Sequence, residues 1–268
     1  VLTLLALFWL LPIIWLLVTS LSAYPGINTQ HFFPEEWSIV NYKRLFLEPN
    51  TVANFPAWFK NSMIIGVFCC IISSIFVLMV AYSFSCMRFK ARKPLMNFSI
   101  ILGMFPGVLS MIAVYFVLKL LGLNDSLVGL IVIYSAGSGL GYLICKGFFD
   151  TIPVSLRESA KLEGASELTI FTRIVIPLSK PIIVYTVINS FLNPWMDFVM
   201  ARLMINSKDP ADWTVAIGLY NILQKTLVND YFSLFCAGGI VVAIPISILF
   251  VIMQKFYVEG ITGGAVKG

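Results

Sequence analysis

The segment that decides the fold runs from Trp58 to Cys86, WFKNSMIIGVFCCIISSIFVLMVAYSFSC, and Lys60 is its one charged residue. An apolar run of about 18 residues or more predicts a helix that crosses a bilayer, whose hydrocarbon core is about 30 Å thick. Five further segments are long and mostly apolar, at residues 1–22, 97–121, 127–148, 178–200 and 232–257. The sequence therefore predicts an all-α, polytopic membrane protein with about six transmembrane helices.

The composition argues against a water-soluble fold. Of the 268 residues, 59% are hydrophobic and 12% are charged, whereas soluble domains have about half and about a quarter. The apolar runs lack the polar–apolar alternation of a membrane β-barrel, so the spans are expected to be helices. The cysteines lie in or beside apolar runs and are expected to serve as small hydrophobic side chains: Cys69, Cys70, Cys86, Cys145 and Cys236.

The basic residues predict the orientation in the membrane. They crowd the links that follow segments 58–86 and 127–148, and links rich in Lys and Arg face the cytoplasm. We therefore expect both termini to be cytoplasmic and the links 23–57 and 201–230 to lie outside. This placement accounts for the net charge of +5 better than nucleic-acid binding does. Segment 1–22 is longer than the apolar region of a usual signal peptide, so a retained span is favoured over a cleaved one.

Aromatic and proline residues add two further expectations. The outer links and their junctions with the spans carry aromatic side chains suited to a membrane interface or to a soluble partner, among them Trp58, the first residue of segment 58–86, and Trp213. A proline inside a span removes a helical hydrogen bond and bends the axis, and bends are expected in segments 97–121, 178–200 and 232–257 at Pro106, Pro194 and Pro245. Prolines are common in membrane helices, so they predict bends without assigning a function.

The link at residues 153–177, PVSLRESAKLEGASELTIFTRIVIP, is too polar to span a membrane. Ser155 and Glu158 have the spacing of a capping box, which predicts that a helix starts at Ser155. Gly164 allows a sharp turn, and Ser166 can cap a second helix. One face of that second helix carries Leu168, Phe171 and Val175, and Pro177 ends the unit. The link is therefore predicted to form a short helix-turn-helix beside the inner membrane face.

Several motifs in this chain resemble a known family. Glu158-Ser159-Ala160, Gly164-Ala165, Phe171, Ile174 and Pro177 resemble the EAA loop of membrane subunits from bacterial ATP-binding-cassette (ABC) importers. The chain departs from that pattern at Ser159, where alanine is usual, and at Glu163, where aspartate is usual. The stretches MFPGVLSMIAVYFVLKLLG at 104–122 and VEGITGGAVKG at 258–268 are similar to the G-type permeases of the maltose/maltodextrin transporter family and its carbohydrate-importer relatives.

The resemblance implies that the chain is a non-catalytic permease in a bacterial cytoplasmic membrane. The EAA loop would be the coupling helix that docks into a separate ATPase, through Glu158, Ser159, Ala160, Glu163, Gly164, Ala165, Phe171 and Pro177. The cytoplasmic tail 258–268 would reach the ATPase dimer through Gly260, Gly263, Gly264 and Lys267. Helix capping by Glu158 and a disordered tail are the simpler alternatives. The chain would bind no cofactor or metal itself, and the ATPase would hold ATP and Mg.

Two other regions are candidates for substrate and partner contacts. Four-residue spacing places polar side chains along one face of segment 178–200, namely Tyr185, Asn189, Asn193 and Asp197, with Trp195 nearby. Amides and an aromatic ring suit a sugar, although hydrogen bonding between helices is an equal alternative. The resemblance implies that a sugar-binding protein docks on the outer link through Lys208, Asp209, Trp213 and Tyr220; a solvated loop is the alternative. It also implies a second homologous permease and a carbohydrate substrate, with maltodextrin as the first candidate.

Two rival classes fit the sequence less well. A secondary transporter driven by an ion gradient normally has paired ionisable groups near mid-membrane, and Asp197 is the one such candidate. A membrane enzyme would need a recognisable catalytic or metal motif; the sequence contains no HExxH and no GxSxG, and its one histidine is His31. The GxxxxGK[ST] phosphate loop is also absent, which predicts that any ATP-driven cycle depends on a separate ATPase.

Overall fold

The structure of the chain is a computed structural model that describes residues 2–27, 31–137 and 140–265, with side chains described to Gln254. Within these residues the secondary structure is helical, apart from one isolated bridge between Ser22 and Trp37. The prediction of an all-α membrane protein is confirmed. The chain divides into two compact units, one built from residues 1–64 and 195–248 and the other from 65–194 and 249–268.

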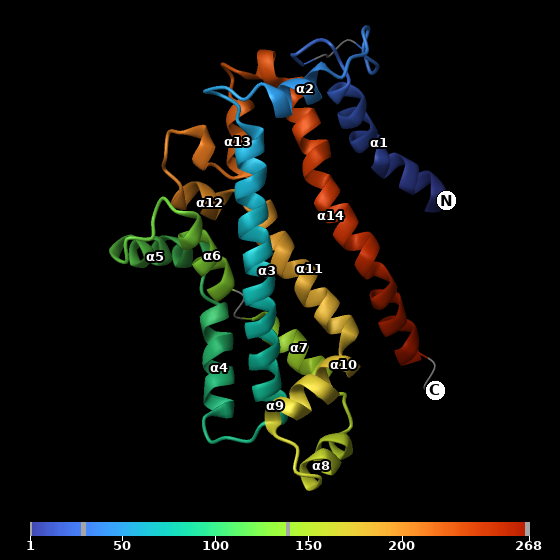
Figure 1. Cartoon of the computed structure of the whole chain (residues 1–268), viewed down its shortest axis with the longest axis vertical. Helices are drawn as coiled ribbons and strands as arrows, with labels where there is room; N and C mark the ends of the chain where they lie inside the picture. Colours follow the sequence, from blue (N-terminus) through green and yellow to red (C-terminus); the bar gives the residue numbers. More distant parts are fainter. Residues whose placement is uncertain (1, 28–30, 138–139, 266–268) are drawn as a thin grey trace. The chain divides into compact units, whose positions relative to one another are not determined.

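Among the residues that the structure describes, three single helices are long and apolar enough to cross a membrane (Figure 1). They are α1 (Leu2–Ser20), α3 (Phe55–Cys86) and α14 (Val228–Ala265), of which the apolar part is Val228–Gln254. These helices correspond to the segments predicted at 1–22, 58–86 and 232–257. Pro245 lies inside α14, which continues through it as one helix.

Three further candidate spans are bent pairs rather than the single segments that apolar run length predicts. α4 (Arg92–Gly103) and α5 (Gly107–Leu120) meet at 103°, α6 (Leu127–Ala136) and α7 (Gly141–Phe149) at 43°, and the helix over Glu167–Leu178 meets α11 (Lys180–Met196) at 90°. At the first bend, Pro106 precedes α5, and its ring prevents a continuous helix. At the third bend, Ser179 lies between Pro177 and Pro181, neither of which has an N–H group to donate.

The first unit is organised around the buried indole of Trp58. This side chain is 0% exposed, stacks on Trp213 with ring centroids 6.2 Å apart, and donates from Nε1 to the Pro210 carbonyl at 2.7 Å. A Cβ atom at Gly218 would lie 2.1 Å from the ring, so glycine is required there. Trp58 was predicted to suit an interface; it is instead a core residue, because its polar N–H finds a backbone partner.

Short helices complete this unit around α3. They are α2 (Val40–Leu47), α12 (Val199–Met204), the 3-10 turn η2 (Pro210–Asp212) and α13 (Val215–Ile222). Asn61 on α3 donates to the carbonyls of Ala211 and Trp213, and Ser62 accepts from the Val215 amide. These bonds satisfy buried backbone groups of the link after α12. That link is therefore held against the first turns of α3.

The second unit has its own core at the end of α3. The remaining helices here are α8 (Val154–Leu162), α9 (Glu167–Ile170), the π-helical turn η1 (Phe171–Val175) and α10 (Ile176–Leu178). The core side chains come from α3, α7, α9, η1 and α11: Ala81, Tyr82, Phe84, Tyr142, Cys145, Phe149, Ile170, Val175 and Ile182. This core joins the link at 153–177 to the membrane helices of the same unit.

Candidate functional site

The candidate site is the two-helix unit, which we define as residues 153–177. Its first helix, α8, begins after Pro153, whose φ of −54° and ψ of 127° direct the chain into the helix. No side chain caps this end. The capping box predicted for Ser155 and Glu158 is therefore wrong, because the proline starts the helix two residues earlier and places Ser155 inside the first turn.

Gly164 forms the turn between the two helices. Its φ is +83°, a backbone conformation that side-chain-bearing residues rarely adopt. The Ala165 amide donates to the Ala160 carbonyl at 2.9 Å, and the Gly164 amide donates to the Lys161 carbonyl at 3.0 Å. These two bonds make a Schellman motif, which satisfies carbonyls at the end of α8. The predicted sharp turn is confirmed.

Ser166 caps the second helix as predicted. Its side chain accepts from the Thr169 amide at 3.2 Å, and its backbone is extended, as an N-cap requires. After one turn of α-helix, residues 171–175 widen into the π-helical turn. Such single π turns occur often at functional positions.

The second helix buries one face in the core of its unit. Ile170 and Val175 are fully buried, and Phe171 packs on Tyr82 with ring centroids 5.0 Å apart. The prediction that Phe171 and Val175 share one face of this helix is therefore confirmed, whereas the ATPase-docking role of Phe171 stays a prediction. Leu168 is exposed instead, because the buried face begins two residues later, at Ile170.

Glu167 ties the two-helix unit to the end of α3. The Tyr82 hydroxyl donates to Glu167 Oε2 at 2.6 Å, and Lys161 on α8 forms an ion pair with the other carboxylate oxygen. One carboxylate thus joins α3, α8 and α9. Hydrogen bonds to a charged group are stronger than neutral ones, so this junction resists separation of the two helices from α3.

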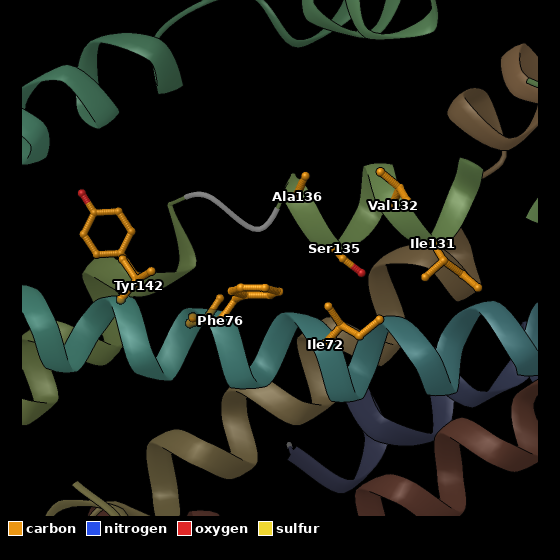
Figure 2. Close-up of a pocket in the computed structure, with 9 residues that line it drawn as sticks. Ile72, Phe76, Ile131, Val132, Ser135, Ala136 and Tyr142 are labelled. Carbon is orange, nitrogen blue, oxygen red and sulfur yellow. The ribbon is translucent and has the colours of Figure 1, made fainter. Parts of the chain in front are cut away.

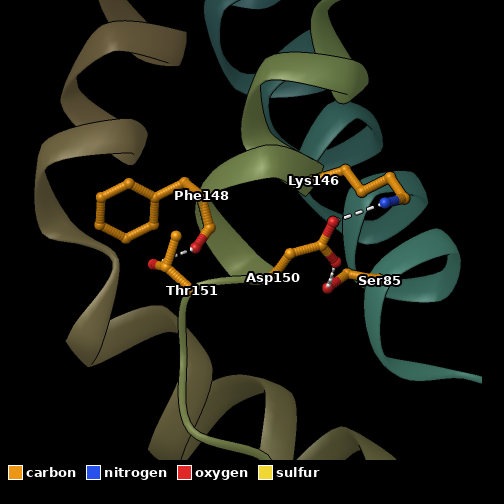
Figure 3. A network of polar contacts seen from close by, with 5 residues as sticks. All are labelled: Ser85, Lys146, Phe148, Asp150 and Thr151. Atoms are coloured by element: carbon orange, nitrogen blue, oxygen red, sulfur yellow. Dashed lines mark hydrogen bonds and ion pairs between the residues drawn. The ribbon is translucent and has the colours of Figure 1, made fainter.

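Asp150 forms a second junction just before the two-helix unit. Its carboxylate accepts from Ser85 on α3 at 2.7 Å and pairs with Lys146 on α7 at 2.6 Å, as Figure 3 shows. Partial burial acts to raise the pKa of Asp150, but the bonds from Lys146 and Ser85 outweigh it and hold the pKa below its usual 3.8. The segment that leads into α8 is therefore fixed to α3 as well.

Much of the surface of the two-helix unit is exposed. Glu158, Ser159, Glu163 and Gly164 are exposed, whereas Ala160 and Ala165 are half-buried against the core. Large apolar side chains are exposed beside them; Leu162 is 90% exposed, and Leu156 and Leu168 are exposed too. Charged groups around exposed leucines are typical of a surface that binds another protein.

The polar residues predicted along one face of segment 178–200, with Trp195 nearby, lie in two places. Tyr185, Asn189 and Asn193 line a cavity of about 240 Å³ in the second unit, together with Ser73 and Ser190. The Asn189 amide donates to the Tyr185 carbonyl, one helical turn earlier.

The other two residues of that set belong to the first unit. Trp195 packs edge-on against Phe59 there. The Asp197 carboxylate accepts from the amides of Val199 and Met200 and so caps the start of α12. Asp197 therefore has a structural partner at a helix start, where a negative charge is favourable.

The predicted partner-binding residues of the link at 201–230 are held by local contacts. Asp209 caps η2 through the Ala211 amide, Trp213 donates to the Ser207 carbonyl and stacks on Trp58, and Tyr220 packs on Phe198. Lys208 is exposed, and about half of the Tyr220 side chain is exposed. Lys208, Asp209 and Tyr220 therefore have exposed side chains, whereas Trp213 is half-buried against Trp58.

The tail residues Gly260, Gly263 and Gly264 lie in the helical backbone of α14, which extends to Ala265. Lys267 lies outside the described residues. The glycine content of the tail suggests an irregular chain, but residues 258–265 have a helical backbone. The role predicted for these four residues stays a prediction.

Sequence reasoning missed Tyr82, Glu167 and Asp150 as junction residues. Tyr82 and Glu167 are 85 positions apart, and Ser85 and Asp150 are 65 apart, so no local spacing relates them. Glu167 directly after the cap residue Ser166 was the available signal, because acidic residues favour a first helical turn.

Helices long and apolar enough to cross a membrane, together with an exposed two-helix unit fixed to α3, define the class of a polytopic membrane protein. The family described as binding-protein-dependent transport system inner membrane component matches residues 84–262. This match covers more than half of the chain, and the chain belongs to this family.

Named relatives and one solved structure are similar along nearly the whole length. The galactooligosaccharides transport system permease protein GanQ and the maltodextrin transport system permease protein MdxG, both of Bacillus subtilis, are each 33% identical. The alignments cover 96% and 94% of this chain and 90% of each relative. The maltose/maltodextrin permease protein MalG of Photorhabdus laumondii is 31% identical over 94% of this chain and 90% of its own.

The solved structure is a bacterial ABC transporter involved in the import of the acidic polysaccharide alginate. One of its chains matches with a TM-score of 0.79 and 22% identity, over 96% of this chain and 93% of that one. At 22% identity, this match shows that the two chains share a fold.

Proposed function

We propose that this chain is the permease subunit of an ABC importer for an oligosaccharide, and that it couples to a separate ATPase through the two-helix unit. The observation that supports this proposal best is the construction of that unit. The unit is fixed to α3 through Tyr82 and Glu167, while Leu162 and Glu158 on its first helix are exposed to solvent. The permeases GanQ, MdxG and MalG supply the expectation of a carbohydrate substrate.

The proposed mechanism follows from how the unit is attached. A partner ATPase that closes would move α8 by docking on Glu158, Ser159, Glu163 and Gly164. The Schellman turn keeps α8 and α9 together, and Glu167 joins both to α3. Phe171 and Pro177 lie on the chain that continues into α11. A displacement of α8 would therefore reach α3 and α11 at the same time. The chain itself would perform no catalysis, since the ATPase would bind ATP and Mg.

The proposed substrate path includes the cavity beside α11. Tyr185, Asn189 and Asn193 offer hydroxyl and amide groups that match sugar hydroxyls. Trp195 and Asp197 stay predicted members of this path. A second homologous permease would complete it, and both termini would face the cytoplasm.

Two further contacts belong to the proposal. An extracytoplasmic sugar-binding protein would meet the outer link at Lys208, Asp209, Trp213 and Tyr220. The tail around Gly260, Gly263, Gly264 and Lys267 would reach the ATPase dimer. Among carbohydrates, maltodextrin and galactooligosaccharide are the first candidates, since they are the substrates named for the similar permeases.

The test is purification of the tagged chain from its native membrane in mild detergent, followed by quantitative mass spectrometry. We expect an ATPase at about twice the level of this chain and a second permease at the same level. Recovery of the chain alone, even after crosslinking, would favour a carrier driven by an ion gradient.

A matched crosslinking pair locates the contact. Leu162→Cys places a thiol on α8 where the side chain is 90% exposed, and Leu120→Cys places one at the end of α5 where the side chain is 88% exposed. The proposal expects ATPase capture from position 162 only. Equal capture from both positions would contradict docking at the two-helix unit.

A further inference from the structure

A basic pocket lies where α3 ends and α8 begins. It has a volume of about 570 Å³ and is lined by four cationic side chains and two carboxylates: Arg88, Arg92, Arg157, Lys161, Glu158 and Glu167. Both Glu167 oxygens already bind Tyr82 and Lys161. The four cationic side chains outnumber the two carboxylates by two, and this excess of positive charge favours an anionic ligand.

Arg157 provides a second, independent observation. Its Nε atom is buried and has no hydrogen-bond partner among the described residues. A buried donor without an acceptor is costly, and it calls for an acceptor from outside the chain. A phosphate group suits a guanidinium well, because its oxygens can accept two parallel N–H bonds.

An apolar cavity lies farther along the same helix. It holds about 470 Å³ between α3 and the pair α6–α7, and its lining on α3 includes Ile72, Phe76 and Val80, as Figure 2 shows in part. These residues recur every four positions on one face of α3, and Met87, which lines the basic pocket, follows directly after the end of that helix. A ligand lying along that face would contact both cavities.

The separation of the two cavities fits one leaflet of a bilayer. Phe76 is ten residues before the end of α3 at Cys86, which corresponds to about 15 Å of helix. Half of the hydrocarbon core is also about 15 Å. Basic residues directly beyond the end of a span are typical of sites for anionic lipid headgroups.

We propose that α3, α6 and α8 bind one anionic phospholipid, with its phosphate at Arg88, Arg92 and Arg157 and an acyl chain in the cavity at Phe76 and Val80. This lipid bridges a membrane helix and the first helix of the two-helix unit. Its headgroup supplies the acceptor that Arg157 Nε lacks. The lipid composition of the membrane then influences how firmly α8 is held.

The test measures lipids retained by the full chain, purified together with whatever partners remain bound. Native mass spectrometry compares added phosphatidylglycerol with phosphatidylcholine of identical acyl chains. We expect at least tenfold higher occupancy by phosphatidylglycerol. Equal occupancy by the two lipids would overturn the proposal.

Variants separate the headgroup site from the acyl-chain site. The double substitution Arg88→Gln with Arg157→Gln is expected to lower phosphatidylglycerol occupancy at least tenfold, whereas Arg173→Gln, an exposed basic residue outside the pocket, leaves it unchanged. Val80→Trp fills the apolar cavity and is expected to lower occupancy at least fivefold without changing a charge. Size-exclusion elution identical to the parent chain shows that each variant is folded.

Inorganic phosphate distinguishes a lipid from a soluble ligand. With the lipid bound, millimolar phosphate is expected to displace less than a tenth of it, because phosphate makes no contact with the apolar cavity. Complete displacement by phosphate, with no effect of Val80→Trp, would assign the basic pocket to a soluble anion and overturn the lipid site.

Discussion

Gly164→Ala and Gly164→Asn, taken together, separate two reasons for a glycine in the turn of the two-helix unit. Gly164 has φ +83°, and a Cβ built there meets nothing within 4 Å. The cost of a side chain is therefore conformational rather than steric within the chain. An L-residue in the left-handed region costs about 1–2 kcal/mol, and asparagine is tolerated there better than alanine.

This cost predicts an order of activities. A loss of 1–2 kcal/mol lowers the ratio of turned to unturned loops about 5- to 30-fold, so Gly164→Ala should lose most of the coupling and Gly164→Asn should retain more. If instead Gly164 leaves room for a docking partner, alanine would be the better tolerated because it is smaller.

The assay is sugar-stimulated ATP hydrolysis by the reconstituted transporter, with limited proteolysis across residues 162–166 as a readout that needs no partner. If the left-handed backbone at Gly164 is the reason for the glycine, proteolytic cleavage should be faster in Gly164→Ala than in Gly164→Asn, in step with lower coupling. Coupling that falls more in Gly164→Asn than in Gly164→Ala would refute it, as would wild-type cleavage in both variants.

Three further perturbations test other parts of the structure. Tyr82→Phe removes the hydroxyl that donates to Glu167 at 2.6 Å. Because a hydrogen bond to a charged group contributes about 1.5–3 kcal/mol, amide hydrogen exchange at residues 167–171 should become faster. Unchanged exchange would contradict the anchoring role of Tyr82. The pKa of Asp150 lies below its usual 3.8 in the folded chain. The stability that its carboxylate contributes is therefore complete above about pH 4 and is lost as the pH falls through the folded pKa. Asp150→Asn should lower the thermal midpoint at pH 7 and make the midpoint less dependent on acid pH, and an unaltered pH profile would disprove this. Trp58→Ala should lower the free energy of unfolding by about 3–5 kcal/mol, as for other buried tryptophans, and lower the thermal midpoint clearly. Trp37→Ala, at a side chain 56% exposed, should change the midpoint little. Similar shifts for both variants would be evidence against a core at Trp58.

The apolar runs were sufficient to predict the helical class and the approximate position of each span. They could not show where a span bends, because run length contains no information about direction. Pro106 marked the 103° break between α4 and α5, but Pro245 lies inside one continuous helix. A proline removes the same hydrogen bond in both places, and tertiary packing decides whether the helix resumes in the same direction.

The two-helix unit was predictable where the determining contacts are local. Gly164 and Ser166 act through backbone groups within five residues, and their roles followed from residue type. Ser155 failed as a cap because Pro153 starts the helix first. The attachment of the unit to α3 depends on Tyr82 and Glu167, and no periodicity along the chain relates residues so far apart.

The stack of Trp58 on Trp213 has an optical consequence. Two indoles with centroids 6.2 Å apart couple their electronic transitions and give a paired circular-dichroism signal that isolated indoles lack. Because Trp58 lies on α3 and Trp213 on the link after α12, that signal depends on the link staying in place. The chain thus contains a label-free spectroscopic reporter of the link after α12, one that can be followed while sugar, a binding protein or nucleotide is added.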